Sequence, residues 1–79
     1  MTGRRVPRPS TRATPSLRHL RTSRALTQAE LAARAGVRRS TIARLEGGRE
    51  GRMHTLGRLA RALEVEPAAL LQPPPEQRL

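Results

Sequence analysis

The chain has 79 residues, enough for one small domain, and a domain of this size buries only about 60 % of the surface of its unfolded chain. It contains no Cys, Phe, Tyr or Trp, so a core must be assembled from Leu, Ala, Val and Ile without disulfides. Sixteen basic residues against six acidic ones give a net charge of +10, which favours a polyanionic partner. This composition argues against a deep catalytic pocket and favours a bundle of short helices.

The first fifteen residues, 1–15, form a basic segment with four arginines, three prolines and no acid. Too few of them are apolar to order the segment by burial, so we expect a disordered arm that either contacts DNA phosphates loosely or is simply solvated. No apolar stretch follows Arg4 and Arg5, and the prolines oppose an amphipathic transit helix, which argues against a targeting signal. Because the sequence has no membrane-spanning run, we expect a cytoplasmic protein without membrane contact.

A helical period begins after Ser16, which is well placed to cap a helix. The residues that share one face, at i, i+3, i+4 and i+7, are Leu17, Leu20, Arg21 and Arg24. Arg21 therefore lies on the inward face. An arginine there needs an anionic partner, because an unpaired charge away from water is costly.

A second helix is predicted from the T-x-x-E pattern of Thr27 to Glu30. In this capping box the Thr hydroxyl accepts from the Glu amide, and the Glu carboxylate accepts from the Thr amide. Leu31, Ala32 and Ala35 form the inward face of the helix. Gly36 then suits a helix that ends in a left-handed turn.

A third helix follows, with Ile42 and Leu45 facing the core. At about 100° per residue, the opposite face and its flanks hold a set of small polar and cationic side chains. These are Arg39, Ser40, Thr41 and Arg44, together with Ala43. Glu46 falls beside the core face, where it can meet Arg21 if the first helix packs alongside.

The rest of the folded part reads as a connector and two further helices. Glycines at 47, 48 and 51 break the third helix, and their loop lacks the lysine of a nucleotide-binding phosphate loop. Helical periodicity returns at Leu56, Leu59, Ala60 and Leu63. Pro67 opens a short fifth helix that extends to residue 71, and 72–79 is a proline-rich, disordered tail. We expect an all-α fold, a compact bundle of five short helices over residues 16–71.

Residues 17–71 closely resemble the Cro/repressor-type helix-turn-helix domain, the Xre family. The motifs that carry the resemblance are L-R-H-L-R at 17–21, L-T-Q-A-E-L-A at 26–32, G-V-R-R-S-T-I-A-R-L-E-G-G-R at 36–49 and T-L-G-R-L-A-R-A-L-E-V at 55–65. The resemblance implies a lambda-repressor-like fold in which the helix at 39–46 enters the major groove of DNA and the helix from 28 crosses the backbone.

The resemblance also implies roles for individual residues. Positions that match base-reading residues are Arg39, Ser40, Thr41 and Arg44. Phosphate contacts are implied for Gln28 and Arg38, and by their place next to this helix also for Arg49 and Arg52. Arg21 and Glu46 match a structural ion pair of the family. The sequence departs from the family pattern at Arg38 and Glu66, where Ser or Thr is usual, and a lost cap costs about 1 kcal/mol.

These observations predict sequence-specific binding of double-stranded DNA by a transcriptional regulator, most simply a repressor that can dimerise on two half-sites. An antitoxin that pairs with a toxin and controls its own promoter is an alternative, as is a protein-interaction module of the same fold. RNA binding ranks lower, since single-strand recognition normally uses aromatic platforms. We expect no enzyme, cofactor or metal site, because the chain lacks Asp and Cys, and its two His are far apart. When bound to DNA, the protein would be associated with the nucleoid.

Overall fold

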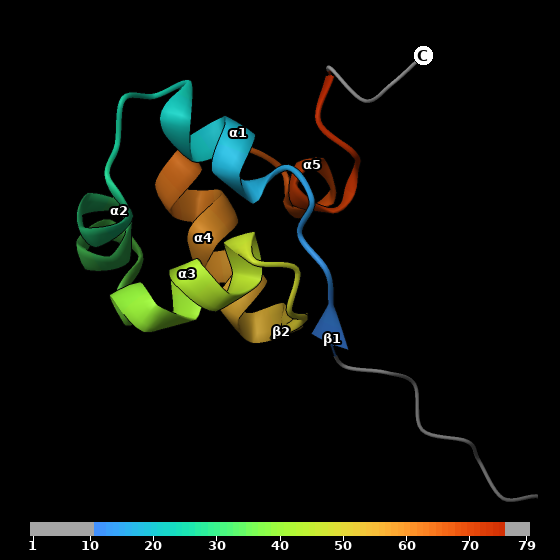
Figure 1. Ribbon diagram of the computed structural model, residues 1–79, viewed down its shortest axis with the longest axis horizontal. Coiled ribbons are helices and arrows are strands. Elements are labelled where there is room, and N and C mark those ends of the chain that lie inside the picture. Colours follow the sequence, from blue (N-terminus) through green and yellow to red (C-terminus); the bar gives the residue numbers. More distant parts are fainter. Residues whose placement is uncertain (1–10, 76–79) are drawn as a thin grey trace, which may run out of the picture.

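The computed structural model describes residues 11–75 and contains five helices and one pair of very short strands (Figure 1). The elements in chain order are β1 (Thr11–Arg12), α1 (Leu17–Thr22), α2 (Gln28–Ala35), α3 (Arg39–Glu46), β2 (Gly51–Arg52), α4 (Met53–Leu63) and α5 (Pro67–Leu71). Helix α4 packs against both α2 and α5, and α3 packs against α1 and α2. The expected five-helix bundle is confirmed, although α4 begins at Met53, ahead of Leu56, where its helical period was expected to begin.

The core is one cluster of aliphatic side chains to which every helix contributes a face. Its largest fully buried members are Leu17, Leu31, Ile42, Leu56, Leu59, Leu63 and Leu70. Full burial of such a side chain stabilises the fold by about 1.5–3 kcal/mol. These leucines therefore replace the aromatic residues that the chain lacks.

Helix α2 is fixed at both ends by local chemistry. Thr27 Oγ1 accepts from the Glu30 amide at 3.0 Å, and Glu30 Oε1 accepts from the Thr27 amide at 2.8 Å, which completes the capping box. The hydrogen bond from the Thr27 backbone is the main reason why the pKa of Glu30 is lowered. Gly36 ends α2 with a φ of 71°, a left-handed conformation that L side chains rarely adopt. The start of α2 is thus fixed by the capping box, and the turn that leads to α3 begins at Gly36.

The strand pair was not expected from the sequence. Thr11 pairs with Arg52 and Arg12 with Gly51, antiparallel, and Thr11 Oγ1 donates to Glu50 Oε1 at 2.7 Å. At Gly51, a Cβ atom would lie 2.7 Å from a methyl carbon of Leu45, so only glycine fits without rearrangement. The described structure thus begins five residues before Ser16, where the folded domain was expected to start, and the expectation for residues 1–10 lies outside the described residues.

Ser16 does not cap α1, and the expectation that it would is wrong. Its hydroxyl donates instead to the carbonyl oxygen of Gln72, and its amide donates to Leu70 O at 3.3 Å. Ser16 is buried, so its hydroxyl needs an acceptor, and the chain that follows α5 supplies it. Pro74 is buried as well, and the residues expected to form a loose tail therefore begin against the bundle. Residues 76–79 lie outside the described part.

Residues 11–75 contain neither a long apolar helix nor a cluster of metal-ligating side chains. No helix there has the length and apolar character needed to cross a membrane. Nor does that part of the chain gather three His, Cys, Asp or Glu side chains in a way that could hold a metal ion.

Candidate nucleic-acid interface

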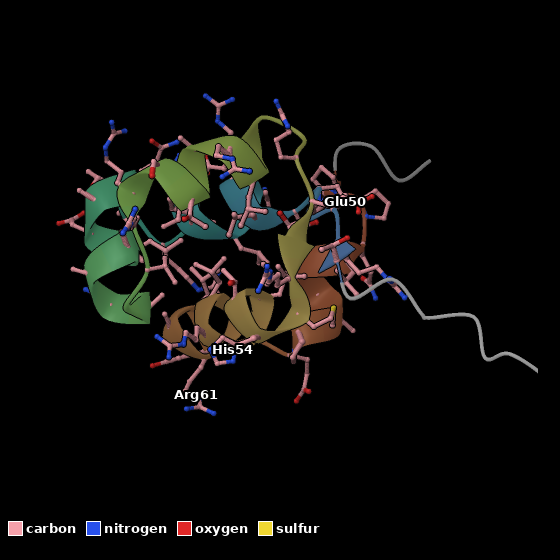
Figure 2. All side chains as sticks on the ribbon, turned by 90° about the horizontal axis from the view of Figure 1, so that it is seen from below. Glu50, His54 and Arg61 are labelled. Carbon is pink, nitrogen blue, oxygen red and sulfur yellow. The ribbon has the colours of Figure 1, made fainter. Side chains whose placement is uncertain are left out.

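Helix α3 has one buried face and one free face. Ile42 is 0 % exposed and Leu45 3 %, so these two side chains fix the rotation of the helix on the core. The opposite side of α3 lies along one edge of the molecule, with its side chains directed away from the bundle (Figure 2). Of the expected base-reading residues, Arg39, Ser40 and Arg44 are exposed and Thr41 is half-buried. The fold therefore presents this set on a single convex surface.

Arg21 and Glu46 form an ion pair between α1 and the last residue of α3. Arg21 Nε donates to Glu46 Oε2 at 2.5 Å and Arg21 Nη2 donates to Glu46 Oε1 at 2.9 Å, the two-pronged geometry typical of strong arginine–carboxylate pairs. The Arg21 side chain is only 11 % exposed and that of Glu46 only 6 %. Arg21 Nη1 also donates to Leu26 O at 2.7 Å, so the pair joins α1, α3 and the segment before α2.

The ionisation of this pair is shifted in the direction that favours charge. Burial raises the pKa of Glu46, but the hydrogen bonds from Arg21 and Gln28 and the nearby arginine charges outweigh burial, so the pKa is lowered. The hydrogen bond to Glu46 in turn raises the pKa of Arg21. Both groups stay ionised in the folded protein at neutral pH, which suits a structural role.

Gln28 extends this pair toward the exposed face of α3. Its Nε2 donates to Glu46 Oε1 at 3.0 Å, and its Oε1 accepts from Arg39 Nη1 at 3.0 Å. A continuous chain of polar contacts thus leads from Arg21 through Glu46 and Gln28 to Arg39. The last two contacts could not be predicted from the sequence, because Gln28 and Arg39 lie on different helices and glutamine is not restricted to one partner.

The start of α3 has no side-chain cap. Arg38 takes the N-cap position with an extended backbone, φ −80° and ψ 146°, and none of its side-chain atoms caps the helix. The first amides of an α-helix have no partner within the helix and carry the positive end of its dipole. The Arg38 guanidinium lies in the same region and is exposed, so cationic groups gather at this end of α3.

At the other end of α3, a groove of about 390 Å³ separates the helix from β2 and the start of α4. Arg44 and Arg52 both line it, whereas Arg49 lies on the exposed loop between them. Thr41, also expected from the sequence, lines it too, whereas sequence reasoning missed the remaining three polar residues, Thr11, Glu50 and Thr55. Only the strand pairing brings Thr11 here, and a two-residue strand leaves no readable pattern in a sequence.

Comparison with known proteins agrees with this geometry. A family model described as helix-turn-helix matches residues 17–70. Among solved structures, the restriction-modification controller protein C.AhdI from Aeromonas hydrophila is 40 % identical, with 68 % of this chain and 83 % of that chain covered and a TM-score of 0.65. The hypothetical transcription factor NHTF from Neisseria is 28 % identical, with 78 % and 71 % covered and a TM-score of 0.69. A search of curated proteins finds no match.

The match spans the capped α2, the glycine turn and the exposed α3 that form the surface described above. The chain therefore belongs to the Cro/repressor-type helix-turn-helix family, the Xre family, and is a DNA-binding protein of transcription regulation.

Proposed function

We propose that the protein recognises a specific duplex DNA sequence by inserting α3 into the major groove and that it represses transcription by occupying a promoter. The observation that carries this proposal is the outward face of α3, where two exposed arginines and two hydroxyl side chains stand above a fully buried aliphatic face. The major groove of B-DNA admits an α-helix and displays a distinct pattern for every base pair.

Within this interface, Arg44 and Arg39 are the principal readers. A guanidinium can donate two hydrogen bonds to O6 and N7 of guanine, a contact that discriminates by about 1–3 kcal/mol. Arg39 is already held by Gln28, which limits its rotamers before DNA binds. Ser40 and Thr41 donate or accept, and the methyl group of Thr41 can also meet a thymine methyl group.

Phosphate contacts position the reader. Gln28 uses one donor on Glu46, and the second hydrogen of its amide group remains for a phosphate oxygen. At the start of α3, the free amides and Arg38 favour a phosphate for the same electrostatic reason. Arg49 and Arg52 extend the cationic surface beyond the end of α3.

A dimer is part of the proposal. Two copies related by a twofold axis would place their α3 helices in successive major grooves, on half-sites about 34 Å apart. The site would then be close to palindromic. With DNA as the partner, the protein works at the nucleoid, in the cytoplasm.

Two regulatory roles other than simple repression use the same reading surface. An antitoxin that controls its own promoter would bind a toxin in addition to DNA. The likeness to C.AhdI supports a third role, that of a controller of restriction-modification genes. The DNA sequence that α3 selects would distinguish self-regulation from repression of another gene, because a self-regulating protein binds upstream of its own gene.

Selection of bound sites from a pool of random duplexes tests the proposal. We expect one motif to emerge at physiological salt, with affinity falling steeply as salt rises. Arg44→Ala should reduce discrimination at one base position, whereas Arg49→Ala should weaken all duplexes alike and lower the salt slope by about 1. Failure of any motif to emerge would falsify sequence-specific reading, and equal effects of the two substitutions would reject the role of Arg44.

A further inference from the structure

A second groove lies on the side of the domain that faces away from α3. It has a volume of about 1010 Å³ and runs between the end of α2, the outer face of α4 and the start of α5. His54 and Arg61 of α4 lie on that side of the molecule, opposite the edge that α3 occupies (Figure 2). The groove is therefore separate from the DNA-reading surface.

The rim of this groove is cationic. Arg34 from α2 and Arg58 and Arg61 from α4 line it, and no acidic side chain does. Arg58 makes one hydrogen bond, from Nη1 to Gly36 O at 3.3 Å, which leaves its charge uncompensated. Arg61 is exposed and makes no hydrogen bond or ion pair with any residue from 11 to 75. A second copy of this face would repel the first, so the groove does not fit self-association.

Apolar side chains line this groove together with the arginines. Met53 is 42 % exposed and is the one large hydrophobic side chain that is exposed among residues 11–75. It shares the groove with Val65 and small residues of α2 and α4. Methionine and arginine are both enriched where proteins meet, and methionine adapts its shape to a partner.

Gly57 lies in the middle of α4 and lines the same groove. A glycine inside a helix is unfavourable by about 1 kcal/mol relative to alanine. At Gly57, an added Cβ would meet nothing within 4 Å, so packing within the domain does not require glycine there. A missing side chain at this point deepens the groove and lets a second backbone approach α4 closely.

From these features we infer that the groove is a docking site for an acidic amphipathic helix of another protein. The apolar face of that helix would cover Met53 and Gly57, and its carboxylates would meet the three arginines. Recognition of an amphipathic helix by an apolar groove is a common mode of peptide binding. A regulator that is bound to DNA through α3 could thus hold a second protein on its opposite side.

A synthetic peptide of about 18 residues, long enough to form a helix, tests this inference. One face carries Leu and Ala and the other Glu, and a scrambled peptide of identical composition serves as its control. Binding is measured by fluorescence anisotropy on the full chain in the absence of DNA, so the result does not depend on the proposed DNA recognition. We expect the amphipathic peptide to bind at least about tenfold more tightly than the scrambled one.

Three variants locate the binding site. Arg61→Glu should weaken peptide binding by about tenfold or more. Arg18→Glu makes an equal change of charge at an exposed position of α1 and should change peptide binding by less than about twofold. Gly57→Leu should fill the groove and weaken peptide binding to a similar extent. The same substitution should leave the melting temperature equal to or above that of the wild type, because leucine is the better helix former.

Three results would overturn the inference. The first is equal binding of the two peptides, which would indicate charge attraction alone. The second is an equal loss in Arg61→Glu and Arg18→Glu. The third is a loss of affinity for duplex DNA that is larger in Arg61→Glu than in Arg18→Glu, since the groove would then be a second DNA surface.

Discussion

Replacement of Glu46 by Gln should remove much of the stability of this domain. The substitution keeps the shape of the side chain but leaves the guanidinium of Arg21, 11 % exposed, without its counter-charge. Loss of one partner of a buried pair typically costs about 3–5 kcal/mol. A chain of this size is stable by only about 4–12 kcal/mol in total, at roughly 0.05–0.15 kcal/mol per residue. Because the amide can still accept a hydrogen bond, we expect a loss near the lower end, about 3 kcal/mol.

Urea unfolding followed by far-UV circular dichroism measures this loss. Glu50→Gln is the matched control, since Glu50 is exposed and accepts only from Thr11 among the described contacts, and it should cost less than about 1 kcal/mol. In a double-mutant cycle with Arg21→Met and Glu46→Met, the double variant should be more stable than the sum of the single losses predicts. Equal losses in the two Gln variants, or strictly additive losses in the cycle, would refute the structural role of the pair.

The pH dependence of stability follows from the same pair. The pKa of Glu46 is lower in the folded protein than in the unfolded chain. Its contribution is therefore fully present above the unfolded value, about 4.3, and is lost as the pH falls through the lower folded value. Glu46→Gln should lack this acid-side loss of stability. If the difference in unfolding free energy between the two proteins stayed constant down to pH 2, about two units below the unfolded pKa, the assignment would be contradicted.

Three further predictions concern the start of α3, the strand pair and the polar chain. Arg38→Ser should supply a helix cap and raise the unfolding free energy by about 0.5–1 kcal/mol, while the salt slope of DNA binding falls by about 1. If the unfolding free energy did not rise, the lack of a capping side chain would not be what weakens the start of α3. Gly51→Ala should cost about 1–3 kcal/mol in urea unfolding, because the new methyl group overlaps buried leucine side chains, and a neutral result would mean that β2 shifts freely. Gln28→Ala should reduce discrimination between bases at the position that Arg39 contacts. Competition between single-base variants of the selected site measures this, and unchanged discrimination would show that Gln28 does not position this arginine.

The parts of the fold that could be predicted are those written in local chemistry. Thr27 and Glu30 are three residues apart, and Gly36 marks the end of α2, so the start and the end of that helix follow from short-range rules. The end of α3 at Gly47 and the start of α5 at Pro67 follow from similar signals. The start of α4 was less clear, because Arg52 and Met53 carry neither a capping side chain nor a proline.

What could not be predicted depends on contacts between distant residues. Ser16 has the side chain of a helix cap, but its hydroxyl donates to the carbonyl of Gln72 instead of capping α1. Thr11 joins the groove beside α3 only through pairing with Arg52, 41 residues later in the chain. At the interface, the outward face of α3 could be read from its period, whereas the restraint of Arg39 by Gln28 could not. Local rules thus predicted the exposed face of α3 but not the contacts that hold its side chains in place.

The contacts of Ser16 have a consequence for how the domain opens. Its amide and hydroxyl join the residue before α1 to the carbonyls of Leu70 and Gln72, so the first and last helices are fastened to each other. Neither α1 nor the end of α5 should then open while the other remains in place, so local opening of these two helices should be suppressed. The amide of Ser16 should exchange its hydrogen with solvent at a rate set by global unfolding, as slowly as the amides of α4. A helix bundle without a single aromatic side chain can in this way unfold as one cooperative unit.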